Sequence, residues 1–391
     1  MLELNPNLTI RKGGHVSGGC VAKSAIWRLG MDNEKLRVGI LGGTGMVGQR
    51  FVSLLENHPW FEVTAIAASP RSAGQTYEAA TKGRWKMDTP MPGAVKNRIV
   101  LNVNEIEKVA AEADFVFSAV VMSKEEIYRI EEAYARADVP VVSNNSAHRW
   151  TPDVPMLLPE LNPGHLDAIE HQKKRLGSKR GFIVVKPNCS IQSYAPMLAA
   201  WKEFEPTEVV ACTYQAISGA GKNFSDWPEM VDNLIPYIGG EEEKSEKEPL
   251  RILGSVKDGV IVPALSPRIT CQCLRVPLLD GHTAAVYINF KDKPTLDQLI
   301  EKIKAFKGLP QELKLPSAPQ PFIHYFAEED RPQVKLDVNV GNGMGITVGR
   351  IRADHIYDFK FIGLSHNTIR GAAGGAVLSA ELLKAKGYIT H

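Results

Sequence analysis

Residues 38–48 read Val38-Gly39-Ile40-Leu41-Gly42-Gly43-Thr44-Gly45-Met46-Val47-Gly48. The apolar start predicts a buried strand, and the glycines that follow predict a tight loop leading into a helix. Glycines allow close approach to a pyrophosphate, and a helix N-terminus favours its negative charge. The spacing departs from the G-x-G-x-x-G pattern, so a tight turn that binds no ligand is the alternative. The predicted cofactor contacts are Gly42, Gly43, Thr44, Gly45, Met46, Val47 and Gly48.

Strands and helices alternate through the first half of the chain. This alternation predicts an α/β fold, a Rossmann-like doubly wound parallel sheet. Ligands bind such sheets at the carboxyl ends of the strands. The expected strands are 37–41, 61–68, 114–120, 139–143 and 182–185, and the expected helices are 49–56, 105–112 and 125–137.

Beyond residue 187 the pattern changes to strands in quick succession. They predict an α+β domain built on an antiparallel sheet with helices on one face. Its expected strands are 208–216, 268–276 and 283–290, with a helix at 191–204 and a terminal helix at 371–386. The expected divisions are a loose extension (1–34), a nucleotide-binding domain (35–186), a second domain (187–365) and a C-terminal helix returning to the first domain (366–391).

Composition narrows the class of protein. With 391 residues, 44% hydrophobic and 23% charged, the chain has the profile of a soluble globular protein with two or more domains. A net charge of +2 argues against nucleic-acid binding, and no apolar run is long enough to cross a membrane. Five cysteines without a framework spacing indicate free thiols in the cytoplasm. Cys271 and Cys273 are expected on one face of a strand, not in a metal site.

Residues 1–30 are rich in glycine and basic residues and contain one acid, Glu3. They have no secretory apolar core. We interpret them as a loose extension or an upstream start, with Met31 as the effective beginning. An organellar transit peptide would have a similar composition.

The end of the second predicted strand bears on the choice of cofactor. An NAD enzyme usually has an acid there for the ribose 2′-hydroxyl, but this chain has Ser69-Pro70-Arg71-Ser72. A guanidinium suits a 2′-phosphate. Ser69, Arg71 and Ser72 therefore favour NADP(H), a solvated loop arginine being the alternative.

A cysteine follows the predicted strand at 182–185, in Lys186-Pro187-Asn188-Cys189. A thiol on such a turn is held rigidly and can face a cleft. Only the thiolate is a strong nucleophile, so a base is needed nearby. The candidate is His282, which an Asp-Gly turn would hold at the start of a strand; a structural histidine is equally consistent with the spacing.

Several separated motifs together resemble aspartate-semialdehyde dehydrogenase, in its archaeal and fungal branch. They are Pro187-Asn188-Cys189, Thr213-Tyr214-Gln215-Ala216-Ile217-Ser218-Gly219-Ala220-Gly221, Glu241-Glu242-Glu243-Lys244, Arg275 seven residues before His282, and Asn367-Thr368-Ile369-Arg370-Gly371-Ala372-Ala373-Gly374-Gly375. The resemblance covers roughly residues 35–390. It implies that residues 35–186 bind NADP and that residues 187–365 form a catalytic and dimerisation domain like that of glyceraldehyde-3-phosphate dehydrogenase. It also implies a homodimer or homotetramer.

The activity that the resemblance implies is reversible conversion of L-aspartyl 4-phosphate to L-aspartate 4-semialdehyde with NADPH, toward lysine, threonine and methionine. Cys189 would be the nucleophile, His282 the acid/base, and Gln215 would orient the acyl group. Implied substrate contacts are Arg275 for the carboxylate, Glu241 for the ammonium, Arg149 and Lys244 for phosphate, and Asn188 beside the thiol. Implied further cofactor contacts are Ser118, Ala119, Ser218, Gly219, Asn367 and Thr368.

Alternatives remain at this stage. The run from Glu241 to Lys244 could be a solvated charge run, and the sequence does not show which of its acids points inward. Malonyl-CoA reductase shares the scaffold, but its substrate has no ammonium for the acidic run to bind. A nucleotide-binding regulator without activity would explain the glycines, but not Cys189, Gln215, Arg275 and His282 together.

Overall fold

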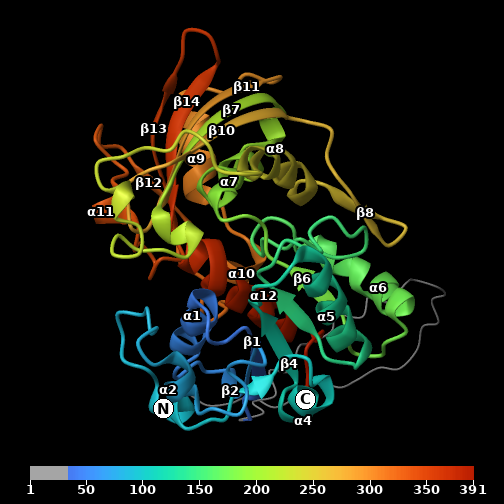
Figure 1. Cartoon of the computed structure of the whole chain (residues 1–391). Helices are drawn as coiled ribbons and strands as arrows, with labels where there is room; N and C mark the ends of the chain where they lie inside the picture. Colours follow the sequence, from blue (N-terminus) through green and yellow to red (C-terminus); the bar gives the residue numbers. More distant parts are fainter. Residues whose placement is uncertain (1–33) are drawn as a thin grey trace, which may run out of the picture. The chain divides into compact units, whose positions relative to one another are not determined.

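The computed structural model describes residues 34–391 (Figure 1). The predicted extension, including Met31 and Cys20, therefore lies outside the described residues. Within them, no helix is long and apolar enough to cross a membrane.

The first sheet is parallel, as predicted, and has the strand order β3-β2-β1-β4-β5-β6. This order reverses between β1 and β4, and dinucleotides bind at such a reversal. The strands are β1 (Leu36–Leu41), β2 (Phe61–Ala68), β3 (Leu101–Asn102), β4 (Phe115–Ser118), β5 (Val141–Ser143) and β6 (Ile183–Val185). The helices are α1 (Met46–Leu54), α2 (Tyr77–Thr81), α3 (Gly93–Lys96), α4 (Ile106–Glu112), α5 (Lys124–Arg136) and α6 (Ile169–Leu176), with a 3₁₀ turn at Pro163–Ala168.

The second sheet has the order β10-β7-β11-β14-β13-β12. Its strands are β7 (Pro206–Gln215), β10 (Arg268–Arg275), β11 (His282–Phe290), β12 (Ile323–Phe326), β13 (Ile346–Ala353) and β14 (Phe359–Ser365). A separate hairpin joins β8 (Ser255–Lys257) to β9 (Val260–Val262). The helices are α7 (Ala195–Ala200), α8 (Glu241–Ile252), α9 (Leu296–Ala305), α10 (Leu309–Glu312), α11 (Val334–Asp337) and α12 (Gly374–Ala385), with short 3₁₀ turns at Ser190–Ser193, Lys202–Phe204, Ile217–Ala220 and Pro228–Met230.

Three predictions about this half were wrong. The sheet is mixed, not antiparallel, because β10 pairs with β7 and β12 with β13 in parallel; a long crossover containing α8 separates β7 from β10 and permits this pairing. The helix expected at 191–204 is broken into α7 and two 3₁₀ turns, since Pro196 fits only a first helical turn. The terminal helix begins at Gly374, after a π-helical turn at Ile369–Ala373.

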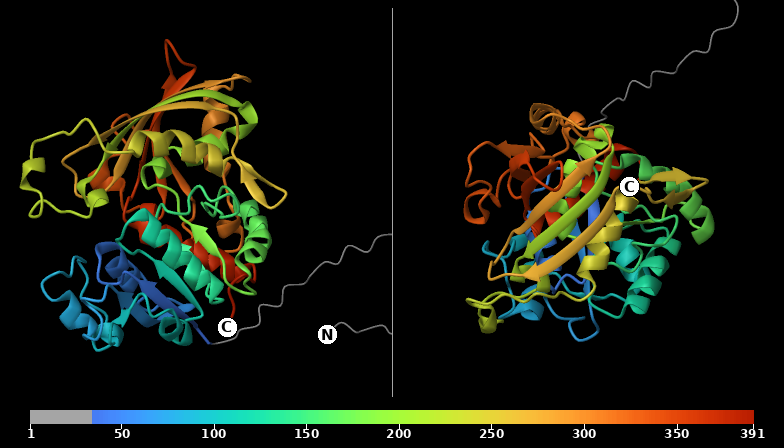
Figure 2. Two further views of the ribbon diagram at one scale, coloured as in Figure 1. Left: turned by 45° about the vertical axis from the view of Figure 1, so that its right-hand side comes forward. Right: turned by 90° about the horizontal axis from the view of Figure 1, so that it is seen from above.

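One face of the second sheet is bare. Figure 2, in its right-hand view, looks onto β7, β10 and β11, and no helix of the described chain covers them. Side chains alternate between the buried and the outer face along each strand, so that Val210 and Tyr214 of β7 point outward. The helices therefore lie on one face of this sheet.

The C-terminal helix belongs spatially with the first sheet. Ala376, Val377 and Leu378 of α12 share a buried cluster with residues of β1 and β4, and α12 contacts α1 and β5. The division of the chain into residues 35–186, 187–365 and 366–391 remains our proposal, and this packing supports it.

A buried ion pair connects the two halves. Arg370, which is 1% exposed, donates to both carboxylate oxygens of Glu160 at 2.8 and 2.6 Å. Its Nε donates to Gln192, in the 3₁₀ turn that Cys189 begins, at 3.2 Å. Its guanidinium lies 4.8 Å from the centre of the Phe322 ring. One side chain thus joins four distant segments.

We expect Arg370→Met to destabilise the protein by about 3–5 kcal/mol, because it leaves a buried carboxylate without its partner. Thermal or urea unfolding would measure the loss. Lys247→Met is the control, since Lys247 pairs with Glu243 on the exposed face of α8 and should leave the unfolding midpoint unchanged. Equal effects of the two substitutions would contradict this role of Arg370.

Candidate active site

The glycine loop joins β1 to α1 at the point where the strand order reverses. Gly42 has φ +82°, and a Cβ there would lie 2.4 Å from the carbonyl oxygen of Ala119, at the end of β4. A Cβ at Gly48 would lie 2.4 Å from the carbonyl oxygen of Gly42. Thr44 to Val47 are partly exposed and form the N-terminus of α1, where backbone N–H groups have no helical partner. The loop therefore fits a pyrophosphate.

The segment after β2 lies next to this loop, because β2 pairs with β1. Arg71 is exposed. The backbone N–H of Ser72 donates to the carbonyl of Ser69 at 2.9 Å and closes the turn that carries Arg71. The guanidinium is thus at the surface, where a 2′-phosphate could reach it.

Cys189 and His282 meet although they are far apart in sequence. The cysteine begins a 3₁₀ turn just after β6, and His282 is the first residue of β11. The Cys189 Sγ and the His282 Nε2 are 3.4 Å apart. A Cβ at Gly371 would lie 2.7 Å from the Cys189 Cβ, so the glycine leaves space for the thiol. The structure thus pairs the predicted nucleophile with the predicted acid/base.

The hydrogen bonds of His282 restrict its tautomer. Its Nδ1 accepts from the backbone N–H of Ala216 at 3.1 Å. In the neutral ring the proton must therefore be on Nε2, facing the sulfur. Burial, and next the charge of Arg275, lower the pKa of His282 to about 3. The ring presents a neutral N–H donor to the reacting centre.

The ends of β7 and β10 supply the neighbouring polar groups. Arg275 donates from Nη1 to the carbonyl of Ala216 at 2.7 Å. A Cβ at Gly219 would lie 3.0 Å from that Nη1 and 3.2 Å from His282 Nε2. Gln215 is buried at the end of β7, and its amide donates to Thr213 at 3.2 Å. Arg275, Gly219 and His282 thus border one space.

Asn188 links the remaining predicted substrate residues in one hydrogen-bond network. Its amide donates to Glu241 at 2.8 Å, and Glu241 also accepts from Lys244 at 2.8 Å. Its backbone N–H donates to Glu248 at 2.6 Å, and Glu248 pairs with Arg149 at 2.9 Å. Both cations predicted to bind phosphate are therefore already oriented by carboxylates.

The orientation of α8 shows which acid of the charge run points inward. Glu241 faces Asn188, and although burial alone would raise its pKa, Lys244 and Asn188 lower it. Glu248 was not predicted from the sequence. It lies seven residues after Glu241, two helical turns along the same face, so helical periodicity in this run could have indicated it.

Glu242 and Glu246, on another face of α8, accept hydrogen bonds from the backbone of β10. Their partners are the N–H groups of Cys273 at 3.4 Å and Cys271 at 3.0 Å. These two carboxylates bind the edge strand β10 and do not face Asn188 or the thiol. Cys271 and Cys273 lie on the same buried face of β10, as predicted.

Asp280 joins several predicted cofactor residues in a second network. Ser218 donates to Asp280 at 2.7 Å and accepts from Asn367 at 2.7 Å, while Thr368 contacts the same carboxylate at 3.5 Å. The Asn367 side-chain oxygen accepts from the N–H of Gly281 at 2.8 Å. This network holds the loop before His282. The Asp-Gly turn at Asp280 was predicted to hold His282, but the partners of the Asp280 carboxylate were not predicted.

Ser118 and Ala119 lie at the carboxyl end of β4. Ser118 accepts a hydrogen bond from Asn145 at 3.1 Å. The N–H of Ala119 donates to the carbonyl of Leu41 at 2.8 Å and so brings β4 against the glycine loop. Both residues are placed at the cofactor edge of the sheet.

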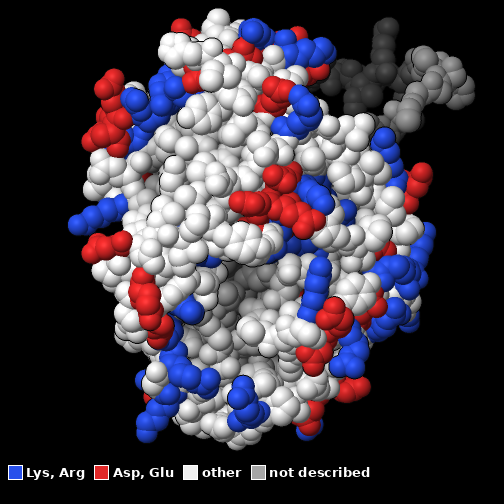
Figure 3. Space-filling view, turned by 45° about the horizontal axis from the view of Figure 1, so that its top comes forward, with Lys and Arg blue, Asp and Glu red and all other residues white. Residues whose placement is uncertain are grey.

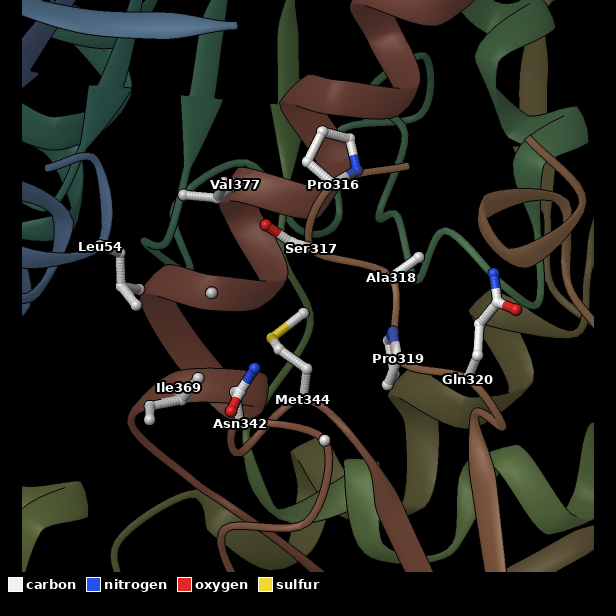
Figure 4. Close-up of a pocket in the computed structure, with 12 residues that line it drawn as sticks. Leu54, Pro316, Ser317, Ala318, Pro319, Gln320, Asn342, Met344, Ile369 and Val377 are labelled. Atoms are coloured by element: carbon white, nitrogen blue, oxygen red, sulfur yellow. The ribbon is translucent and has the colours of Figure 1, made fainter. Parts of the chain in front are cut away.

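Two cavities differ in their relation to these residues. One of about 370 Å³ contains none of the predicted site residues (Figure 4); it is lined by Leu54, Pro316, Ser317, Ala318, Pro319, Gln320, Gly341, Asn342, Met344, Ile369, Gly374 and Val377. The other, of about 480 Å³, contains Arg149 and Lys244, with Lys124, Ser146, Trp150, Gly240, Glu243, Lys247 and Glu248. The second is the one suited to an anion.

Charges on the face shown in Figure 3 are mixed, with Lys and Arg beside Asp and Glu. A polyanion would need a continuous basic surface. Among residues 34–391, no cluster of three or more His, Cys, Asp or Glu side chains could hold a metal ion. In this part of the chain, the predicted catalytic side chains are gathered around Cys189.

Two family models match the chain. The model described as "Semialdehyde dehydrogenase, NAD binding domain" matches residues 37–169. The model described as "Semialdehyde dehydrogenase, dimerisation domain" matches residues 195–370. The first match reaches from β1 to β5, and the second covers every strand of the second sheet.

Individual proteins resemble the chain over most of its length. The aspartate-semialdehyde dehydrogenase of Methanothermobacter thermautotrophicus is 42% identical, over 89% of this chain and 99% of the relative. That of Saccharomyces cerevisiae is 40% identical, over 90% and 98%. A crystal structure of the Candida albicans enzyme with NADP has a TM-score of 0.81 and 37% identity, and the match covers 91% of this chain and all of that one.

Proposed function

Because this chain belongs to the aspartate-semialdehyde dehydrogenase family, we propose that Cys189 carries the acyl group while L-aspartyl 4-phosphate is converted to L-aspartate 4-semialdehyde. The single observation that supports this assignment most strongly is the 3.4 Å contact between Cys189 Sγ and His282 Nε2. The reaction is an early step in the synthesis of lysine, threonine and methionine. Its cofactor is NADP(H).

The proposed reaction begins at the sulfur. The Cys189 thiolate attacks the acyl carbon, the bond to the phosphate oxygen breaks, and inorganic phosphate leaves a thioester. Bound NADPH supplies the hydride that reduces this thioester. The oxyanion that forms would lie where the buried His282 Nε2–H can donate to it. Collapse then releases the aldehyde and returns the thiolate.

The substrate groups match the charges around the thiol. Arg275 is the proposed partner of the α-carboxylate, since a planar guanidinium binds a carboxylate through two hydrogen bonds. Glu241 is proposed for the α-ammonium, and Arg149 and Lys244 for the phosphate. Asn188 holds the turn and Gln215 orients the acyl group. In this proposal the substrate binds to side chains that the Asn188 network already holds in place.

The proposed cofactor contacts surround the reversal in strand order. Backbone N–H groups of the glycine loop would hold the pyrophosphate, and Arg71, flanked by Ser69 and Ser72, the 2′-phosphate. The backbones of Ser218 and Asn367 are proposed near the nicotinamide, since their side chains already bind within the Asp280 network.

Cys189→Ser should lower the rate by about a thousandfold or more, because an alcohol is far less ionised than a thiol. The assay is phosphate-dependent reduction of NADP with aspartate semialdehyde. Cys212→Ser, at a half-exposed position on β7, is the matched control and should retain activity. Turnover near that of the wild type in Cys189→Ser would refute the nucleophile.

His282→Ala should lower kcat by about 10²–10³-fold, as expected for loss of an oxyanion donor. The rate at which iodoacetamide alkylates Cys189 should fall far less, because His282 presents a proton to the sulfur and does not accept one. Mass spectrometry of the Cys189 peptide measures the alkylation. Parallel losses of both rates would show instead that His282 generates the thiolate.

Self-association follows from the family, and we propose a homodimer formed through the bare face of the second sheet. On this face the outward side chains near the strand centres, such as Val210, Tyr214 and Ala285, are uncharged and half-buried. A broad uncharged surface of this kind suits a second copy.

Ala285→Arg should therefore convert the protein to a monomer, since it places an unpaired charge in the centre of the proposed interface. Light scattering should give twice the chain mass of 43.0 kDa for the unmodified protein and a single chain mass for the variant. Glu301→Arg, exposed on α9, should leave the mass unchanged. A monomeric unmodified protein would refute the proposed dimer.

The proposed compartment is the cytoplasm. The four described cysteines are free thiols, and the sulfurs of Cys271 and Cys273 stay separate at 3.8 Å. Free thiols persist in a reducing cytosol. Recovery of the enzyme from an oxidising compartment after fractionation would contradict this proposal.

A further inference from the structure

Glu131 is a buried acid that the proposed reaction leaves unused. It lies on α5, where the other buried side chains are Ile127, Ile130, Tyr134 and Ala135. Its side chain is 0% exposed. Within residues 34–391 its hydrogen-bond partners include no cation, and its Oε2 has no partner at all. Acids this deeply buried are usually paired with a cation, so Glu131 is unusual.

The Glu131 carboxyl connects the ends of two strands. Its Oε1 accepts from the hydroxyl of Ser143, the last residue of β5, at 2.6 Å, and from the amide of Asn145 at 3.0 Å. The Asn145 amide also donates to Ser118, the last residue of β4, at 3.1 Å. The Ser143 hydroxyl in turn accepts from the backbone N–H of Asn145 at 3.0 Å. One acid thus holds the turn that leaves β5 against the end of β4.

The end of β4 borders the glycine loop. The backbone N–H of Asn144 donates to the Ser118 carbonyl at 2.9 Å, and the N–H of Ala119 donates to Leu41 at 2.8 Å. A Cβ at Gly42 would lie 2.4 Å from the Ala119 carbonyl oxygen. A shift of the turn after β5 would therefore move the strand end against which the glycine loop packs.

The same turn leads to Arg149, the residue proposed to bind phosphate. Arg149 donates from Nη2 to the carbonyl of Asn144 at 3.4 Å. The side-chain nitrogen and oxygen of Asn144 are buried, and neither has a hydrogen-bond partner within the described part of the chain. A buried amide of this kind is unfavourable unless water or a ligand pairs with it. The turn therefore lies where a bound ligand can complete its hydrogen bonds.

The surroundings of Glu131 favour the uncharged acid. The polar side chains around its carboxyl are those of Asn145, Ser118 and Ser143, and none of them carries a charge. Burial raises the pKa of Glu131, and the hydrogen bonds from these three side chains lower it by less. A neutral carboxyl keeps both hydrogen bonds at Oε1 and avoids a buried, unpaired anion.

We propose that Glu131 is a positioning residue that, as an uncharged acid, holds the turn after β5 between the NADP(H) site and the phosphate site. The inference rests on the proposed cofactor contacts of Ser118 and Ala119 and on the proposed role of Arg149. It accounts for a polar side chain in the middle of the apolar face of α5.

The first test is Glu131→Leu in the full chain. Leucine suits the apolar face of α5 but accepts no hydrogen bond, so Ser143 and Asn145 lose their shared partner. The dissociation constant for NADPH, measured from the fluorescence of the bound cofactor, should rise about tenfold, and so should the KM for phosphate. The kcat at saturation should fall by less than about threefold, because Glu131 touches none of the reacting groups. Glu125→Leu, exposed on the same helix, is the control and should leave all three values unchanged.

Glu131→Gln tests the charge of the acid. Glutamine keeps the acceptor oxygen and is uncharged, so it should bind NADPH and phosphate as the unmodified protein does. Affinities as weak as those of the leucine variant would show that an anion is required and would overturn the inference.

Glu131→Asp serves if the leucine variant does not fold. Its shorter side chain withdraws the acceptor from Ser143 and Asn145, so it should weaken NADPH and phosphate binding in the same way. A residue with only a structural role would lower the melting temperature and leave both affinities in place, which would also overturn the inference. Absence of phosphate-dependent turnover in the unmodified protein would instead refute the proposed function. The NADPH titration separates the two failures, because it needs no turnover.

Discussion

The buried pair between Arg370 and Glu160 is the constraint on which the site depends. Arg370 follows the loop that carries Asn367, and its third hydrogen bond reaches Gln192, three residues after Cys189. Two charges this deeply buried are tolerated only when each meets the other in good geometry. The thiol turn, the first sheet and the C-terminal turn are therefore held in a single relative arrangement, and Gly371 reaches the thiol as a result.

The charged side chains around Asn188 are paired in the same way. Glu241 and Glu248 each accept from a cation and from Asn188, so no charged group in this network is without a partner before substrate arrives. In the proposed reaction an incoming phosphate would meet the Arg149 guanidinium, whose direction is already set by Glu248. Such preorganisation avoids reorienting dipoles during the reaction, which is where much of the catalytic advantage of an enzyme originates.

Local signals explain what could be predicted from sequence. The strand, glycine loop and helix around Gly42, and the strand followed by Cys189, depend on neighbouring residues, so periodicity and glycine spacing were sufficient. Glu248 and Asp280 acquire their importance from partners that lie up to 99 residues away in the chain. The parallel pairing of β10 with β7 could not be predicted from local sequence either, because it depends on the long crossover that contains α8. Family resemblance supplied the proposed roles of Arg275 and Glu241, since spacing alone was also consistent with a solvated charge run from Glu241 to Lys244.

Helix α8 has a consequence for how copies of this chain can meet. β10 is an edge strand, and an uncovered edge invites another strand to continue the sheet from molecule to molecule. Glu242 and Glu246 occupy two of its N–H groups, so that edge is poorly suited to continuing the sheet. On this side of the molecule, two copies can then meet through the bare face of the second sheet. Because face-to-face contact between identical surfaces closes on itself, α8 directs growth toward a finite particle and away from a fibre.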